Sequence, residues 1–166
     1  MKWRLIAGAL AVGAAVIGTI GVLRTTRASA EAPGASQVAV SAPSIAQVQE
    51  TALRIAAGNG EADPSGMEEA ASRVGTVAHV VEPDGTGPMI ADPETGKPWS
   101  ETQVYAVTMR GHFTFNGPVP RDRPAPTGTS LTVMINARTG ALVSEALGDS
   151  APNMHAISSN VTPLGG

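Results

Sequence analysis

The sequence contains no cysteine and few aromatic residues, and both absences restrict what the protein can be. Without cysteine the core must hold together without disulfide bonds, and thiol catalysis and thiolate metal sites are excluded. Aromatic residues make up only 3% of the chain. Those that follow residue 30 all lie in one stretch: Trp99, Tyr105, Phe113 and Phe115. We therefore expect this stretch to form the centre of the hydrophobic core.

The motifs of the commonest hydrolases are also missing. The chain has no Gly-x-Ser-x-Gly, Ser-x-x-Lys or His-Glu-x-x-His, the patterns that present a serine nucleophile or a pair of zinc-binding histidines. The histidines, His79, His112 and His155, are too widely spaced for a local zinc signature. We therefore predict that the protein is not an enzyme and has neither a metal site nor a cofactor.

The first thirty residues follow the order of an export signal. Lys2 and Arg4 precede an apolar run from Leu5 to Leu23, and the small tripeptide Ala28-Ser29-Ala30 follows it. These are the parts of a secretory signal peptide. There is no twin-arginine pair, which favours the general secretory route. Residues 1–30 therefore predict an exported protein.

Two fates of this segment stay open. Cleavage near Ala30 would release a secreted domain. Alternatively, a helix from Leu5 to Leu23 would be long enough to cross a bilayer, and the uncleaved segment would anchor the protein to the membrane. Basic residues flank both ends of the run, so charge does not decide its orientation.

The chain that follows residue 30 is acidic. Residues 1–30 contain four of the 11 Lys and Arg and none of the 14 Asp and Glu, so the remainder has a net charge of −7. Proteins that bind nucleic acid cluster lysine and arginine to contact phosphates. We therefore exclude nucleic acid as a partner, and expect contact with a membrane only through residues 5–23.

The rest of the chain predicts one α+β domain over residues 44–148, between a flexible spacer at 31–43 and a mostly irregular tail at 149–166. A helix is expected to begin at Ser44, which forms a capping-box pattern with Gln47, and to end at Gly58 in a left-handed cap. Its apolar stripe comprises Ile45, Val48, Ala52, Ile55 and Ala56. A second, short helix is expected over residues 65–73.

About four antiparallel strands are expected after this helical part. The first spans residues 74–81, where both faces are apolar, and a turn at Pro83 ends it. Residues 83–98 follow as a long loop or small hairpin. The clearest strand, at 103–115, alternates an apolar face with a polar face. Strands at 130–136 and 142–147 are joined by a tight turn at 136–140. The fold predicted is a helix packed on an antiparallel sheet.

Two passages resemble known proteins. They are Val104 to Phe113, and Leu131 to Gly148 with its Ile-Asn-Ala-Arg-Thr-Gly turn. Together they resemble uncharacterised exported proteins of high-GC bacteria, and the second is similar to the strand, Asp-x-x-Thr-Gly turn and strand that end PepSY-type domains. Asn136 stands where that pattern usually has aspartate. The resemblance implies a helix on an antiparallel sheet and a role in binding or restraining envelope peptidases, and it carries over no catalytic residues.

Arg110 and His112 are the candidate binding residues. Both belong to the polar face of the strand at 103–115, where a cation and an imidazole two residues apart can hold a carboxylate. The alternative is that both are ordinary solvent-facing residues of a half-buried sheet. His79, which lies between valines, is interpreted as a hydrogen-bonded core or interface residue, and His155 as part of the irregular tail.

The function predicted is that of a non-enzymatic domain, secreted or in the cell envelope, that binds a protein or peptide, with pairing at a sheet edge as one mode. Two alternatives stay open. One is a small-ligand carrier or enzyme with a pocket between helix and sheet that contains His79 or His112. The other is a structural surface protein without a ligand.

Overall fold

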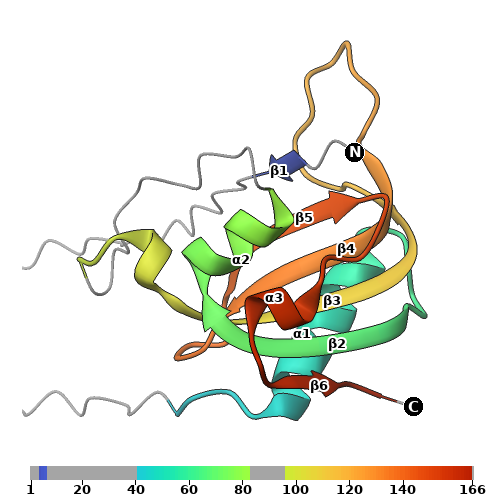
Figure 1. Cartoon of the computed structure of the whole chain (residues 1–166). Coiled ribbons are helices and arrows are strands. Elements are labelled where there is room, and N and C mark those ends of the chain that lie inside the picture. Colours follow the sequence, from blue (N-terminus) through green and yellow to red (C-terminus); the bar gives the residue numbers. More distant parts are fainter. Residues whose placement is uncertain (1–3, 7–40, 83–95, 166) are drawn as a thin grey trace, which may run out of the picture. The chain divides into compact units, whose positions relative to one another are not determined.

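In the part of the chain that the structure describes, six strands form one antiparallel sheet with helices on both faces, so the protein is α+β, as the sequence predicted (Figure 1). The computed structural model describes residues 4–6, 41–82 and 96–165. The order of the strands across the sheet is β1-β5-β4-β3-β2-β6. Their bounds are β1 Arg4–Ile6, β2 Ser65–Arg73, β3 Gln103–Thr114, β4 Thr127–Asn136, β5 Leu142–Gly148 and β6 Val161–Pro163. The sheet therefore has more strands than the four expected.

Helices cover both faces of this sheet. Their bounds are α1 Ile45–Gly58, α2 Val74–Val81, the 3-10 turn η1 Trp99–Glu101, and α3 Met154–Ile157. On one face α1 packs through Val48, Ala52 and Ala56 onto side chains of the central strands. On the other face α2 and α3 pack over a second apolar cluster. Two apolar layers, one on each side of the sheet, therefore form the core.

The capping box at the start of α1 is confirmed. The backbone N–H of Gln47 donates to Ser44 Oγ at 3.3 Å, and the N–H of Ser44 donates to Gln47 Oε1 at 2.8 Å. Two details of the prediction were wrong. Ile45 is exposed, and the left-handed glycine after the helix is Gly60, with a φ of +89°, rather than Gly58. Because the N–H of Asn59 still donates to helix carbonyls, the left-handed turn comes two residues later than predicted.

In residues 65–81 helix and strand occur in the opposite order to the one predicted. The expected short helix at 65–73 is strand β2, and the expected strand at 74–81 is helix α2. The buried residues of α2, Val74, Val77, Ala78 and Val81, follow the helical period, and the three valines belong to the second cluster. Strand β2 is held between β3 and β6, so pairing on both sides outweighs the helix preference of its Glu and Ala residues.

Strand β3 is confirmed, and it forms the centre of both clusters. Its predicted apolar face, including Met109 and Phe113, contacts the α1 side. The opposite face is solvated over only part of its length. Thr108 is only 1% exposed, because α2 and α3 cover that part of the sheet. Its hydroxyl accepts a hydrogen bond from Thr132 Oγ1 at 3.4 Å. Only from Arg110 onward does this face reach solvent.

The hairpin from β4 to β5 is also confirmed. Asn136 Oδ1 accepts hydrogen bonds from the backbone N–H groups of Arg138 and Thr139, at 2.8 and 3.1 Å. This is the turn chemistry for which asparagine is suited. The tail at 149–166 contains α3 and β6, two short elements that the sequence did not predict.

The expected spacer at 31–43 and the expected loop or hairpin at 83–98 both lie largely outside the described residues. So does the apolar run at 5–23, except for Leu5 and Ile6, which belong to β1. None of the helices in the described ranges has the length and apolar character to cross a membrane.

Glu69 in β2 is a carboxyl group in the core, 4% exposed. Burial raises its pKa above the ordinary value of 4.5, because the charged form is penalised away from water. The folded state therefore loses stability as the pH rises through the raised pKa, and is relieved of this cost below 4.5.

We expect Glu69→Gln to raise the free energy of unfolding at neutral pH. The advantage should shrink as the pH falls below 4.5, where the wild-type carboxyl is protonated in both states. Urea unfolding across this range measures it. The exposed neighbour Glu68, changed to Gln, provides the matched control. A Glu69→Gln advantage that does not change with pH would contradict the account.

Candidate functional site

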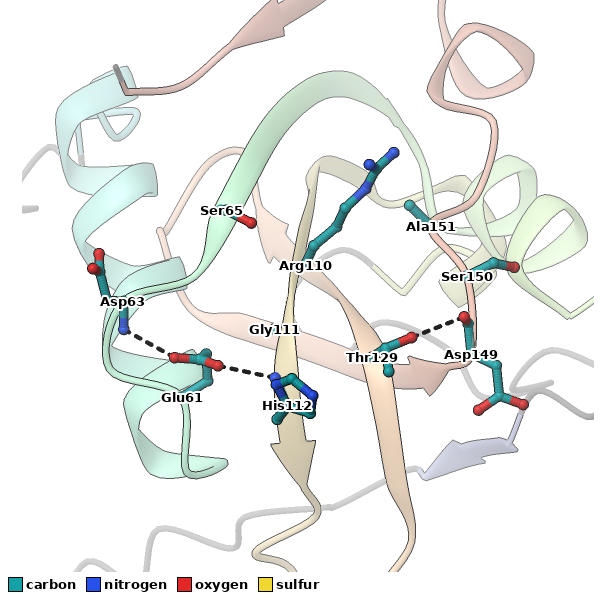
Figure 2. A pocket seen from close by; sticks show the side chains of 10 residues that line it. All are labelled: Glu61, Asp63, Ser65, Arg110, Gly111, His112, Thr129, Asp149, Ser150 and Ala151. Carbon is teal, nitrogen blue, oxygen red and sulfur yellow. Dashed lines mark hydrogen bonds between the residues drawn. The ribbon is translucent and has the colours of Figure 1, made fainter.

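An open hollow of about 640 Å³ lies at the end of the sheet where Arg110 and His112 emerge (Figure 2). Three strands and two loops form it. The residues that line it are Glu61, Asp63, Ser65, Arg110, Gly111, His112, Thr129, Asp149, Ser150 and Ala151. The structure thus brings both candidate residues of the sequence into one site.

The pairing of β2 with β3 and of β3 with β4 is irregular beside the hollow. The register shifts after Ser65 in β2 and again between Arg110 and Phe113 in β3, so each strand carries a β-bulge beside the hollow. Bulges bend a strand and re-aim its side chains, and they are frequent next to binding sites. Here the two bulges lie beside Arg110 and His112, the exposed residues of β3 that line the hollow.

Arg110 is an exposed cation without an acidic partner in the described part of the chain. Its stem passes Gly66, where an added Cβ would lie 3.7 Å from Arg110 Cδ. In Figure 2 the guanidinium group points away from Glu61. The group is therefore available to a ligand.

Glu61 is held against β3 by hydrogen bonds from the backbone. Its Oε2 accepts from the N–H of His112 at 2.9 Å, and its Oε1 accepts from the N–H of Asp63 at 3.2 Å. A Cβ at position 111 would lie 2.5 Å from Glu61 Cγ, so any larger residue there would displace the Glu61 side chain from its present position. The bond between Glu61 and His112 fixes the loop after α1 to the bulge of β3.

The same hydrogen bonds shift the ionisation of Glu61. The N–H groups of His112 and Asp63 favour the charged form and lower the pKa of Glu61 below the ordinary value of 4.5, and the charge of His112 adds to the effect. A lowered pKa means that the carboxylate stabilises the folded state above pH 4.5, and that this contribution is lost as the pH falls through the lowered value.

We therefore expect Glu61→Gln to lower the free energy of unfolding at neutral pH and to have a smaller effect well below pH 4.5. Urea unfolding at both pH values is the measurement. Glu50→Gln, on the exposed side of α1, controls for the loss of one negative charge. Equal destabilisation by Glu61→Gln at every pH would show that the carboxylate charge is not what the backbone N–H groups stabilise.

A buried hydroxyl group lies next to the hollow. Ser130 is the residue directly opposite Arg110 in the pairing of β3 with β4, and it is fully buried. Its Oγ has no hydrogen-bond partner within the described ranges. Leaving such a group unpaired costs about 1–3 kcal/mol.

Most of the lining residues could not be identified from the sequence. Glu61 and Asp63 come from the loop after α1, and Asp149 from the segment after β5, where its carbonyl accepts a hydrogen bond from Thr129 Oγ1 at 2.8 Å. They meet β3 only in the folded chain, because they come from segments far from it in the sequence. The one local signal was Gly111, because a glycine inside a strand indicates a bulge or a close approach.

The remaining histidines lie elsewhere. His79 is exposed on α2, so the interpretation of this residue as part of the core was wrong: the helical period turns it away from the valines on either side. His155 is exposed on α3. No group of three or more potential metal-ligating side chains occurs within residues 4–6, 41–82 and 96–165.

Comparison of the chain with family models, curated proteins and solved structures gave no match. The similarity to PepSY-type domains stays a prediction from the two passages that suggested it.

Proposed function

We propose that this is an exported, non-enzymatic domain, secreted or in the cell envelope, that binds a protein or peptide, and that Arg110 pairs with a carboxylate of that partner. The observation that supports the proposal is the exposed guanidinium of Arg110, which has no acidic partner in the described chain although the domain is acidic. The planar fork of N–H donors on arginine matches the two oxygens of a carboxylate.

The form of the hollow favours a partner chain over an enclosed small molecule. Seven of its ten lining residues are exposed and none is buried. Small-molecule sites enclose roughly 70–90% of their ligand and are mostly apolar. The volume of about 640 Å³ does lie within the range of about 300–1,000 Å³ for such sites, so a small carboxylic acid is the second candidate. The apolar clusters between the helices and the sheet contain neither His79 nor His112.

The charges around the hollow restrict the charge that a ligand can carry. Asp63 and Asp149 are exposed on its rim and would repel a polyanion. A single carboxylate in an otherwise neutral or basic segment therefore fits better than an acidic tract. The imidazole of His112 lies beside the fixed carboxylate of Glu61 and supplies a second polar group to the ligand.

The test is a comparison of three short alanine peptides by isothermal titration calorimetry with the full chain. One has a free C-terminal carboxylate, one is amidated, and one is amidated with an internal glutamate. We expect the amidated alanine peptide to bind at least about tenfold more weakly than the best carboxylate peptide, because a charge-assisted pair is lost. The two carboxylate arms distinguish a chain terminus from an acidic side chain. Equal binding of all three would overturn the proposal.

Sodium acetate and a free amino acid serve as the controls for the second candidate. If either binds as tightly as the best peptide, the hollow is a small-acid site, because the rest of the peptide then contributes nothing.

A further inference from the structure

The edge of the sheet formed by β5 is covered by the start of the chain itself. Strand β1 pairs antiparallel with β5, with Arg4 opposite Leu147 and Ile6 opposite Glu145. This strand is three residues long and belongs to the segment that the sequence predicts to be an export signal. A short, extended piece of chain can therefore occupy the β5 edge.

The sequence of β5 lacks the features that usually protect an exposed edge. It reads Leu-Val-Ser-Glu-Ala-Leu-Gly, without lysine or proline. Natural edges are blunted by charge, proline or short length. The one charged residue, Glu145, is engaged with the fold, because its Oε2 accepts a hydrogen bond from Asn59 Nδ2 at 3.0 Å. The opposite edge, β6, is short and contains Pro163. The two edges thus differ in their capacity to pair.

Both expected fates of the N-terminal segment uncover β5. Cleavage near Ala30 removes residues 4–6 from the domain. Anchoring through Leu5 to Leu23 places Leu5 and Ile6 in the bilayer instead of on the sheet. In either exported form the backbone groups at Glu145–Leu147 that β1 covers become available.

We propose that in the exported protein an extended apolar segment of a partner protein adds to the sheet antiparallel to β5, at the position that β1 occupies here. Main-chain hydrogen bonds would supply affinity, as in other cases of strand addition. The inference rests on the export included in the proposed function, but not on Arg110, which lies on β3.

A partner fits this edge better than a second copy of the chain. The strand that occupies it reads Arg-Leu-Ile, apolar with one positive charge. A second exported domain would bring its own net charge of −7 to a surface of the same sign. The segment sought is therefore extended, apolar and neutral or basic.

The probe is a synthetic peptide with the sequence of residues 2–8, acetylated and amidated so that it carries no free carboxylate for Arg110. In the full chain, β1 competes with this probe from within the molecule. The variant Leu5→Pro weakens that competition because proline cannot donate to a ladder. Fluorescence anisotropy should show that Leu5→Pro binds the labelled peptide about tenfold or more tightly than the wild type, since a tethered strand acts at millimolar effective concentration.

A second variant uses a disulfide to hold β1 on the β5 edge. Leu5 and Ala146 are direct partners in the ladder, at a spacing suited to a disulfide, and the chain has no cysteine of its own to interfere. We expect oxidised Leu5→Cys/Ala146→Cys to lose binding of the peptide and to regain it on reduction. Equal binding by the oxidised and reduced forms would overturn the proposal, as would dimerisation of Leu5→Pro without binding of the peptide.

The two proposals fail separately. Arg110→Gln should leave binding of this capped peptide unchanged, whereas the disulfide should leave binding of the free-carboxylate peptide unchanged. If the disulfide abolishes binding of the capped peptide but not of the free-carboxylate peptide, the β5 edge is a binding surface distinct from the hollow.

Discussion

Replacing Arg110 by glutamine should weaken binding of the carboxylate peptide by at least about tenfold and remove the preference for a carboxylate over an amide. The substitution keeps a polar side chain of similar length but removes the positive charge and the paired donors. A hydrogen bond to a charged group contributes about 1.5–3 kcal/mol, which corresponds to roughly ten- to a hundredfold in affinity. Titration calorimetry with the free and amidated peptides measures both effects.

Arg54→Gln is the matched control, because it changes the net charge equally on the exposed side of α1. We expect it to retain the preference for carboxylate. Arg110→Lys is informative as well, since it keeps the charge but loses the planar fork of donors, and its affinity should lie between those of the wild type and Arg110→Gln. If Arg54→Gln and Arg110→Gln weaken binding alike, the effect is one of general charge and the hollow is not the site.

Phe113→Ala should have the largest effect on stability, a loss of about 3–5 kcal/mol in the free energy of unfolding. Phe113 is 1% exposed in the cluster between α1 and the sheet, one residue beyond His112. Removing the ring leaves a cavity in this cluster, and the cost grows with the volume of the cavity that stays unfilled. Because folded domains are stable by only about 5–15 kcal/mol, the loss is a large fraction of the total. Urea denaturation followed by circular dichroism is the measurement.

Thr114→Ala, at the next and exposed position, provides the control for Phe113→Ala. We expect it to change the free energy of unfolding by no more than about 0.5 kcal/mol, as is usual for surface substitutions. If Phe113→Ala is equally mild, β3 is not the centre of the core, and the support that it gives to Arg110 and His112 is weaker than the structure indicates.

Where the sequence had a clear period and suitable end residues, it predicted the fold correctly. In α1 the cap at Ser44 and the buried stripe through Val48 and Ala52 agree with one another. In β3 the alternation of apolar and polar residues predicted which face meets α1. The turn at Asn136 fixed the hairpin from β4 to β5. Local chemistry was sufficient in these segments.

The exchange of helix and strand at residues 65–81 shows where local chemistry fails. Val74, Val77 and Val81 fit a helical period, but a short apolar run fits a buried strand as well. The neighbouring segment, rich in Glu and Ala, became strand β2 because β3 and β6 supply pairing partners on its two sides. Those partners come from segments far away in the chain, so the competition is decided by tertiary structure.

Only part of the candidate site could be predicted, again because segments far apart in the chain complete it. Arg110 and His112 were identified from one strand, where a cation and an imidazole share a face. Glu61 and Asp149 join them through the loop after α1 and the segment after β5. The alternation of apolar and polar residues in β3 gave no sign of the bulge between Arg110 and Phe113, for which Gly111 is the one local signal.

The most direct test of the central claim is to locate the bound carboxylate by NMR. The side-chain Nε–Hε signal of Arg110 and the backbone amide signals of Ser65, Arg110 and His112 should be recorded while the free-carboxylate peptide is added to the full chain. The account predicts that these signals move most, and that the amidated peptide does not move the Nε–Hε signal. An unchanged Arg110 Nε–Hε signal at saturating carboxylate peptide would contradict the account.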